Sequence, residues 1–264
     1  MKHFVKPAID AYSWVEGPNY YQEYKTYSEY NYLRPGVSSY IKTRHFEIAL
    51  RLTRRHFHTC NVIDLGCVDG IFLPSLSRHF HRVMGVDNNP KFIKICEGLL
   101  SRLDLKNVEL MCNNNLTVND LRLRLSGRSY GIVYLLETLE HVGDKDFPYE
   151  SRIDFLRKIA TLIAEDGIIV ISVPKMVGIP FLIQRIGLAV LRLPREEISM
   201  SDLLKSSFLN NTGDLEKRWE HLKHLGFNHK KMESPLNTAF HILQKKELLF
   251  QVMYVIGKRK MFAA

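Results

Sequence analysis

The chain has 264 residues, of which 45% are hydrophobic, 25% charged and 11% aromatic. This is ordinary globular composition, and it argues against a disordered, collagen-like or disulfide-stapled chain. The 37 Lys and Arg residues against 28 Asp and Glu residues give a net charge of +9, which favours an anionic neighbour such as nucleic acid, an acidic membrane surface or a charged substrate.

The cysteine pattern and the N-terminal residues indicate a soluble, cytoplasmic protein. The four cysteines form no C-x-x-C pair and no close cluster with histidine, so we expect a reducing compartment and no structural zinc site. They are Cys60, Cys67, Cys96 and Cys112. Residues 1–7 lack the apolar core of a signal peptide, and no apolar run approaches the roughly 20 residues that span a bilayer.

Residues 1–43 form a predicted N-terminal arm that is rich in tyrosine. These tyrosines show little periodicity, and they are Tyr12, Tyr20, Tyr21, Tyr24, Tyr27, Tyr30, Tyr32 and Tyr40. Tyrosines in such an arm either pack on the surface with their hydroxyl groups in water or build a lid and an acceptor-binding wall. Both interpretations stay open at this point.

From residue 44 onward the sequence predicts one domain built on a mostly parallel sheet. After a helical pattern at about 41–57, short apolar runs alternate with helix-length segments. The runs lie at 62–65, 83–86, 108–111, 132–136 and 168–173. This alternation is typical of βαβ units. Asn89 and Pro90 predict the start of one helix, and Gly167 predicts the end of the helix over 155–163.

The domain, at 44–264, contains a predicted insertion at about 175–212. The apolar stretch 181–193 predicts a helix whose narrow polar side holds Arg185 and Arg192. Such a helix packs on the core, lies at a lipid interface, or covers an active site and admits an apolar acceptor. The remaining expected elements are a helix at 214–225 ended by Gly226, a helix at 235–244 and a last strand at 248–256.

Two strand ends carry the residues that indicate a ligand site. Asp64 lies in the first strand, before the turn Gly66-x-x-x-Gly70, and the second strand ends at Asp87, 23 residues after Asp64. Open parallel sheets bind ligands at the carboxyl ends of their strands, and glycines let the backbone approach a ligand closely. An acid about 20 residues after the first turn suits the two hydroxyl groups of a ribose. Turns with two glycines are common. The ligand site is therefore indicated only by the glycine turn together with the acid at the end of the second strand.

Together these elements resemble the class I S-adenosylmethionine (SAM)-dependent methyltransferases over residues 44–175. The similar segments are 63–67 with Gly70, 85–87, the fourth-strand motif of the small-molecule branch at 130–142, and 156–173. Within that branch the chain resembles the ubiquinone-biosynthesis-type O-methyltransferases. The resemblance implies an α/β fold with a doubly wound, Rossmann-like sheet of seven strands, helices on both faces, an antiparallel last strand and an insertion after strand five.

The resemblance also implies which residues bind SAM, whose product is S-adenosylhomocysteine. The methionine part would be surrounded by the turn after the first strand, the ribose hydroxyl groups would be held by Asp87, and the adenine would lie beside Asn114. The implied set is Asp64, Gly66, Cys67, Gly70, Asp87, Asn88, Asn114 and Leu136.

Three residues depart from the family pattern. Val68 replaces the usual middle glycine, and because a β-branched residue resists positive φ, we expect Val68 at negative φ in a locally different turn. Asn114 replaces the usual acid beside adenine and brings no charge, and Gly131 replaces a common aspartate. Val68 and Asn114 keep open the alternative of a degenerate module that binds SAM without turnover.

Glu137, Glu140 and His141 form a Glu-x-x-Glu-His pattern after the fourth strand. SAM is an activated methyl donor, so an enzyme mainly aligns the acceptor and removes its proton. Histidine titrates near neutrality, which makes His141 with Glu140 the predicted catalytic pair. The three side chains could instead be structural, or could hold a divalent metal, which is the less favoured interpretation. Similar triplets occur in ubiquinone-biosynthesis O-methyltransferases and in small-RNA 2′-O-methyltransferases.

We therefore predict a SAM-dependent methyltransferase that acts on a small-molecule or lipid-linked acceptor, at oxygen rather than nitrogen. The basic clusters are expected to be solvated faces, and no RNA-recognition signature is present, so nucleic acid is not the expected partner. Peripheral contact with an anionic membrane surface is an alternative that the insertion raises. The rival functions are an RNA methyltransferase that uses the basic surface and an inactive SAM-binding module.

Overall fold

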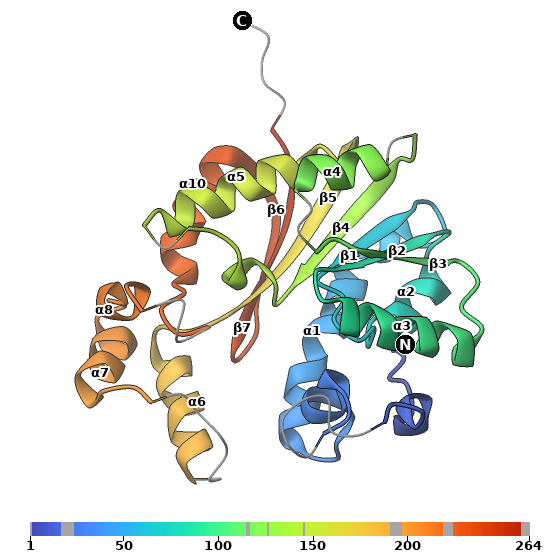
Figure 1. The fold of residues 1–264 in the computed structure, drawn as a ribbon. Helices are drawn as coiled ribbons and strands as arrows, with labels where there is room; N and C mark the ends of the chain where they lie inside the picture. Colours follow the sequence, from blue (N-terminus) through green and yellow to red (C-terminus); the bar gives the residue numbers. More distant parts are fainter. Residues whose placement is uncertain are drawn as a thin grey trace, which may run out of the picture. The chain divides into compact units, whose positions relative to one another are not determined.

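In the computed structural model, seven strands form one sheet in the order β3-β2-β1-β4-β5-β7-β6 (Figure 1). The structure describes residues 2–16, 24–114, 117–125, 127–144, 146–190, 197–218 and 224–259. The strands are β1 Val62–Leu65, β2 Val83–Asp87, β3 Val108–Cys112, β4 Tyr130–Leu136, β5 Ile163–Pro174, β6 Phe240–Glu247 and β7 Gln251–Lys258. The predicted seven-stranded, doubly wound sheet is confirmed.

Helices precede, separate and follow these strands along the chain. The short ones are η1 Ile9–Tyr12, η2 Glu29–Leu33, η3 Arg54–His56 and η4 Leu139–His141. The α-helices are α1 Val37–Thr53, α2 Leu73–His79, α3 Pro90–Leu103, α4 Val118–Arg124, α5 Pro148–Ala160, α6 Ile179–Val190, α7 Met200–Phe208, α8 Gly213–Glu216 and α10 His229–Ala239. Within the described ranges, no helix has the length and apolar character to cross a membrane.

The chain divides into two compact units. The first unit comprises residues 1–136 and 161–170, and the second comprises 137–160 and 171–264. Strand β5 contributes residues to both, because the division falls between Val170 and Ile171.

The first unit contains the parallel part of the sheet. β1 pairs in parallel with β2, Leu65 opposite Val86, and with β4, Asp64 opposite Tyr134. Both β1 and β2 are buried along their whole length, as expected of parallel strands that are covered on both faces. Because parallel strands end at the same edge, the sheet brings Asp64 and the end of β2, at Asp87, to one place.

The N-terminal arm packs on the first unit through aromatic side chains. Phe4 stacks on Phe46 with ring centroids 5.1 Å apart, and Tyr12 is buried. Part of the arm is therefore core rather than surface. Tyr20 and Tyr21 of the predicted tyrosine set lie outside the described residues.

The second unit contains the antiparallel pair β6 and β7. Their register runs from Phe240 opposite Lys258 to Glu247 opposite Val252, which confirms the predicted antiparallel last strand. The helix predicted over 235–244 is wrong in its second half, since α10 ends at Ala239 and β6 begins at Phe240. Most residues of β6 are exposed, so the strand lacks the apolar run that marks a buried strand.

Two other local predictions have different outcomes. Asn89 caps α3, its side-chain oxygen accepting from the Lys91 amide at 3.0 Å, which confirms that helix start. Gly167 does not end a helix: it lies inside β5, and α5 already ends at Ala160. A Cβ atom at Gly167 would lie 2.8 Å from the Ile163 Cβ, so this glycine permits close packing within the strand.

The segment predicted as a helix over 214–225 is described only in part. Helix α8 covers Gly213–Glu216, and residues 219–223 lie outside the described residues. Gly226 has a φ of +94°, which suits a glycine in a turn after this segment.

Candidate active site

In the first unit, the turn after β1 begins where β1 and β2 end side by side. The amide groups of Gly66 and Cys67 both donate to the Val86 carbonyl, at 2.8 and 3.1 Å. Gly66 and Gly70 have φ values of +88° and +87°, which glycine adopts without steric cost. The turn therefore exposes backbone at the carboxyl edge of the sheet, where ligands of this architecture bind.

Val68 corrects the prediction of a negative φ, because its φ is +51°. Its amide donates to Asp87 Oδ2 at 2.9 Å, and its carbonyl accepts from the Cys96 thiol at 3.2 Å. A non-glycine residue in this region costs about 1–2 kcal/mol, and such strain persists only where surrounding contacts fix the backbone. The turn thus keeps the left-handed conformation although the usual glycine is missing.

Asp64 and Asp87 place two carboxyl groups at this edge with little access to water. They are 4% and 7% exposed. Burial, and secondarily the neighbouring Asp87, raises the pKa of Asp64 to about 7. Burial also raises the pKa of Asp87, although amides that include those of Asn89 and Val68 donate to its carboxylate. A cation bound beside Asp64 would favour its charged form, so this edge suits a ligand that carries an amino group.

The end of β3 adds a residue that sequence analysis missed. Asn114 is exposed. The preceding Asn113 donates its amide to the Asp87 carbonyl at 2.9 Å, and its buried side-chain oxygen has no hydrogen-bond partner among the described residues. Leaving such an acceptor unsatisfied costs about 1–3 kcal/mol. A ligand donor such as an exocyclic amine would satisfy it.

The other predicted cofactor residues contribute in different ways. Contact with the Cys96 thiol, followed by burial, raises the pKa of Cys67 well above its usual range, so Cys67 can offer a ligand only its backbone. Asn88 is exposed beside Asp87. Leu136 is buried at the last position of β4.

In the second unit, the chain that leaves β4 forms a turn with both predicted acids. Glu137 has a φ of +55°. Its amide donates to the Ser172 carbonyl at 3.0 Å, and the Ser172 hydroxyl donates to Glu137 Oε1 at 2.8 Å. Burial, followed by the charge of Glu140, raises the pKa of Glu137, and burial likewise raises the pKa of Glu140. This turn therefore holds two acids that resist ionisation unless a positive partner is present.

Two histidines lie beside Glu140. Glu140, His141 and His224 each place one potential ligand atom within 4.8 Å of those of the other two. His224 Nδ1 lies 3.3 Å from Glu140 Oε1, and the two imidazole rings are 4.5 Å apart at their centroids. His141 is exposed, whereas Glu140 is fully buried. The cluster thus presents one accessible imidazole, supported by a buried carboxylate and a second histidine.

A buried arginine holds this cluster in place. Arg152 of α5 is 2% exposed and donates to the carbonyls of Leu139 at 3.2 Å and Glu140 at 3.1 Å. Its guanidinium also lies 4.9 Å from the centre of the Phe227 ring, three residues after His224. Arg152 therefore connects the turn that carries His141 to the segment that carries His224.

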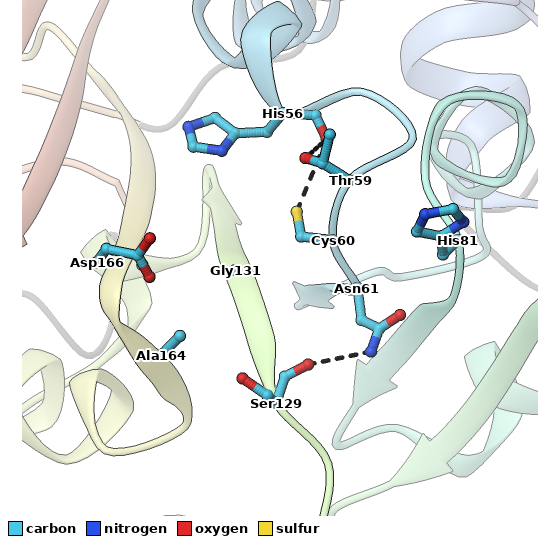
Figure 2. A pocket seen from close by; sticks show the side chains of 10 residues that line it. His56, Thr59, Cys60, Asn61, His81, Ser129, Gly131, Ala164 and Asp166 are labelled. Carbon is cyan, nitrogen blue, oxygen red and sulfur yellow. Dashed lines mark hydrogen bonds between the residues drawn. The ribbon is translucent and has the colours of Figure 1, made fainter.

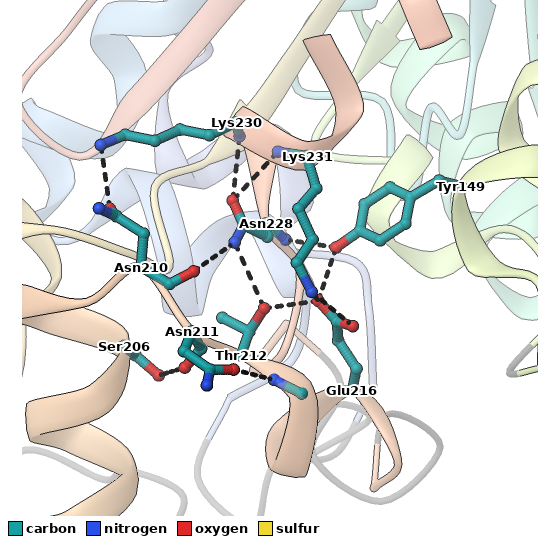
Figure 3. Close-up of polar contacts among 10 residues, drawn as sticks. Tyr149, Ser206, Asn210, Asn211, Thr212, Glu216, Asn228, Lys230 and Lys231 are labelled. Atoms are coloured by element: carbon teal, nitrogen blue, oxygen red, sulfur yellow. Dashed lines mark hydrogen bonds and ion pairs between the residues drawn. The ribbon is translucent and has the colours of Figure 1, made fainter. Parts of the chain in front are cut away.

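A network of polar contacts surrounds the start of α10 (Figure 3). Asn228 caps α10 by accepting from two backbone amides, and its Nδ2 donates to the Asn210 carbonyl at 2.9 Å. Glu216 receives hydrogen bonds from Tyr149 at 2.9 Å and from Lys231 at 2.8 Å. These contacts join α5, α8 and the start of α10, and Asn210 of the insertion takes part in them.

A separate cavity of about 510 Å³ lies at the opposite end of the strands in the first unit (Figure 2). Its lining residues precede or begin β1, β2, β4 and β5, and they include His56, Cys60, His81 and Asp166. Because ligands of open parallel sheets bind at the carboxyl ends, this cavity at the amino ends is not the predicted cofactor site.

Comparisons with known proteins show the family and agree with the fold. A family model described as a methyltransferase domain matches residues 37–237. The PH0226 protein from Pyrococcus horikoshii OT3 is similar with a TM-score of 0.57 and 14% identity, over 92% of this chain and 100% of that chain. At such identity the likeness shows the fold alone. Comparison with the curated proteins gives no match.

Two further solved structures are similar. An S-adenosylmethionine-dependent methyltransferase from Clostridium acetobutylicum ATCC 824 has a TM-score of 0.54 and 13% identity, over 83% of this chain and 92% of that chain. The N-methyltransferase NodS from Bradyrhizobium japonicum WM9, in complex with S-adenosyl-L-homocysteine, has a TM-score of 0.51 and 14% identity, over 82% and 87%.

Proposed function

The chain belongs to the methyltransferase-domain family, and we propose that it transfers the methyl group of SAM to an oxygen atom of a small-molecule or lipid-linked acceptor. Family membership supports the methyl transfer and the cofactor. The observation that carries the choice of oxygen is the cluster of Glu140, His141 and His224, because a hydroxyl group must lose its proton to become methylated and an imidazole can accept that proton.

The residues of the first unit fit SAM by their chemistry. Asp64 suits the amino group of the methionine part, and Asp87 suits the ribose hydroxyl groups. The buried side-chain oxygen of Asn113 suits the adenine amino group, with Asn114 next to it at the surface. Backbone groups of the turn after β1, together with Asn88 and the end of β4 at Leu136, complete the proposed contacts.

The residues of the second unit supply the proton chemistry. Bound SAM would supply an activated methyl group on a sulfonium leaving group, so the protein's own task is to align the acceptor hydroxyl group and remove its proton. His141 takes the acceptor proton, and Glu140 stabilises the charged imidazole pair because its carboxylate lies 3.3 Å from His224. The exposure of His141 lets an acceptor reach it.

A variant at the base tests this function. A general base contributes about 10²–10⁴-fold to rate, so His141→Asn should lower kcat by at least about a hundredfold and leave the affinity for S-adenosylhomocysteine unchanged. His241→Asn, at an exposed position of β6, is the matched control and should keep full activity. Equal kcat values for the two variants would exclude His141 as the base.

A divalent metal is the second candidate role for the same cluster. Two imidazoles and one carboxylate are a donor set that transition ions such as zinc accept, and their mutual proximity favours this role. A bound ion would lower the pKa of an acceptor hydroxyl. Activity that is lost on chelation and restored by one ion would support the metal. Activity that survives chelation leaves His141 acting as a free base.

The insertion supports an apolar or lipid-linked acceptor. Apolar side chains on α6 and α7 are at least 46% exposed, and they are Ile179, Ile183, Ile186, Val190, Met200, Leu204, Phe208 and Leu209. Ile179, Ile183, Ile186 and Val190 recur at helical spacing and so share one exposed face of α6, and an exposed apolar face of this kind marks an interaction site. The polar side predicted for this helix differs from the structure, because Arg185 is 6% exposed and Arg192 lies outside the described residues.

We therefore include peripheral lipid contact through this face in the proposal. Liposome co-sedimentation should show binding of the intact protein and its loss in the double variant Ile183→Ser/Ile186→Ser. Leu123→Ser, which changes an even more exposed apolar residue of α4, is the control and should bind normally. Equal sedimentation of the intact protein and the double variant would contradict lipid contact by this face.

A further inference from the structure

Asp69 is a buried acid in the turn after β1. The proposed function gives this residue no role. It is fully buried, and burial raises its pKa to about 6 against the opposing effect of hydrogen bonds from Ser28. Its carboxyl group is thus shielded from solvent by the surrounding chain. A buried carboxylate is stable only when donors surround it, and here the donors come from the N-terminal arm.

The arm contacts Asp69 at two points. The Ser28 amide donates to Asp69 Oδ2 at 2.6 Å, and the Ser28 hydroxyl donates to Asp69 Oδ1. The Tyr12 hydroxyl donates to the Asp69 backbone carbonyl at 3.3 Å. Ser28 and Tyr12 are 0% and 2% exposed, so these are interior contacts.

The same arm also packs on α3, which borders the turn. A Cβ atom at Gly98 would lie 2.1 Å from Trp14 Cζ2, so the indole lies directly on the helix where glycine leaves room. Tyr27 meets Phe92 edge to face with ring centroids 6.4 Å apart. The packing on α3 therefore holds the arm in place where it contacts Asp69.

Asp69 follows Val68, the residue held at positive φ. Valine favours leaving that conformation, and the contacts that prevent it are the bonds of Val68 to Asp87 and Cys96 together with those of Asp69 to the arm. We propose that Asp69 is a positioning residue for cofactor binding, which clamps the arm to the turn after β1 and so keeps Val68 in its left-handed conformation. This inference rests on the proposed function for its effect on SAM.

The test compares variants with valine and with glycine at position 68, because the valine makes the clamp necessary. Ser28→Ala should weaken binding of S-adenosylhomocysteine about tenfold, the order set by the preference of a β-branched residue against this conformation. In a Val68→Gly background the same change should cost less than about threefold, because glycine adopts positive φ without a clamp. Ser39→Ala, which removes another buried arm hydroxyl that donates to the Tyr32 carbonyl, is the control and should leave affinity unchanged.

Hydrogen exchange in the ligand-free protein gives a readout that does not depend on the cofactor. Ser28→Ala, and separately Tyr12→Phe, should speed exchange of the amides at 66–70, whereas Ser39→Ala should not. The inference is overturned if Ser28→Ala behaves like Ser39→Ala, or if its effect is the same with valine and glycine at position 68. Failure of the intact protein to bind S-adenosylhomocysteine would overturn the proposed function instead, and hydrogen exchange would still decide the clamp.

Discussion

Proton release at Asp64 is a quantitative consequence of the proposed cofactor site. The carboxyl group of Asp64 has a pKa of about 7 in the ligand-free protein because it is buried and close to Asp87. If the amino group of SAM binds beside it, Asp64 must be ionised in the complex, and binding below neutral pH must release its proton.

The size of the effect follows from that pKa. Each pH unit below the free-state pKa lowers affinity by up to about tenfold, so affinity should fall by roughly one to two orders of magnitude from about pH 7.5 to about pH 5.5. The linked effect on stability has a definite sign. A carboxyl group with a raised pKa in the folded state stabilises the ligand-free protein below its unfolded-state pKa, and this contribution is lost as the pH rises through about 7.

Titration calorimetry in two buffers of different ionisation enthalpy measures the released protons directly. We expect nearly one proton released for each S-adenosylhomocysteine bound at about pH 6, and none for Asp64→Asn. Asp64→Asn should also bind S-adenosylhomocysteine more weakly near neutral pH. Without ligand, its free energy of unfolding should be higher than that of the intact protein by at most about 4 kcal/mol. Proton release that is absent in the intact protein, or unchanged in Asp64→Asn, would refute the assignment of Asp64 to the amino group.

Three further predictions concern single residues of the first unit. Asp87→Ala should weaken cofactor binding by about 1–3 kcal/mol, because charge-assisted hydrogen bonds to the ribose are lost, and calorimetry showing unchanged affinity would remove the ribose role. Val68→Gly should raise the free energy of unfolding by up to about 1 kcal/mol, since relief of left-handed strain exceeds the entropic cost of glycine; a lower stability in chemical denaturation would mean that valine packing dominates. Asn113→Ala should weaken adenosine-containing ligands but not methionine in competition assays, and an equal loss for both would place Asn113 away from the adenine.

Strands β1, β2 and β4 were predictable because buried parallel strands form continuous apolar runs. The same rule missed β6 altogether, because the exposed residues of this strand include Lys245 and Lys246. It also misplaced Gly167, because a glycine that permits close packing inside a strand looks in sequence like one that ends a helix. Local sequence patterns therefore identified strands that are buried along nearly their whole length. They failed where contacts with other segments determine which residue type is found at a position.

Some residues of the candidate site could be predicted from the sequence and others could not. Asp64 and Asp87 could be identified from their spacing, since the topology of βαβ units fixes where strand ends meet. His224 could not, because it lies 83 residues after His141 and meets Glu140 only in the folded chain. The conformation of Val68 could not be predicted either, since the valine side chain argues for negative φ while distant contacts at Asp87, Cys96 and the arm impose the opposite.

We propose above that this methyltransferase moves a methyl group from SAM to an acceptor oxygen with His141 as the base. Its most direct test is transfer from methyl-labelled SAM into fractionated small-molecule, lipid and RNA pools by the intact protein and by His141→Asn. We expect label in an ether linkage in the small-molecule or lipid fraction, matched mole for mole by S-adenosylhomocysteine, and transfer at least about a hundredfold slower for His141→Asn. Label confined to RNA, or tight SAM binding without transfer to any pool, would contradict it.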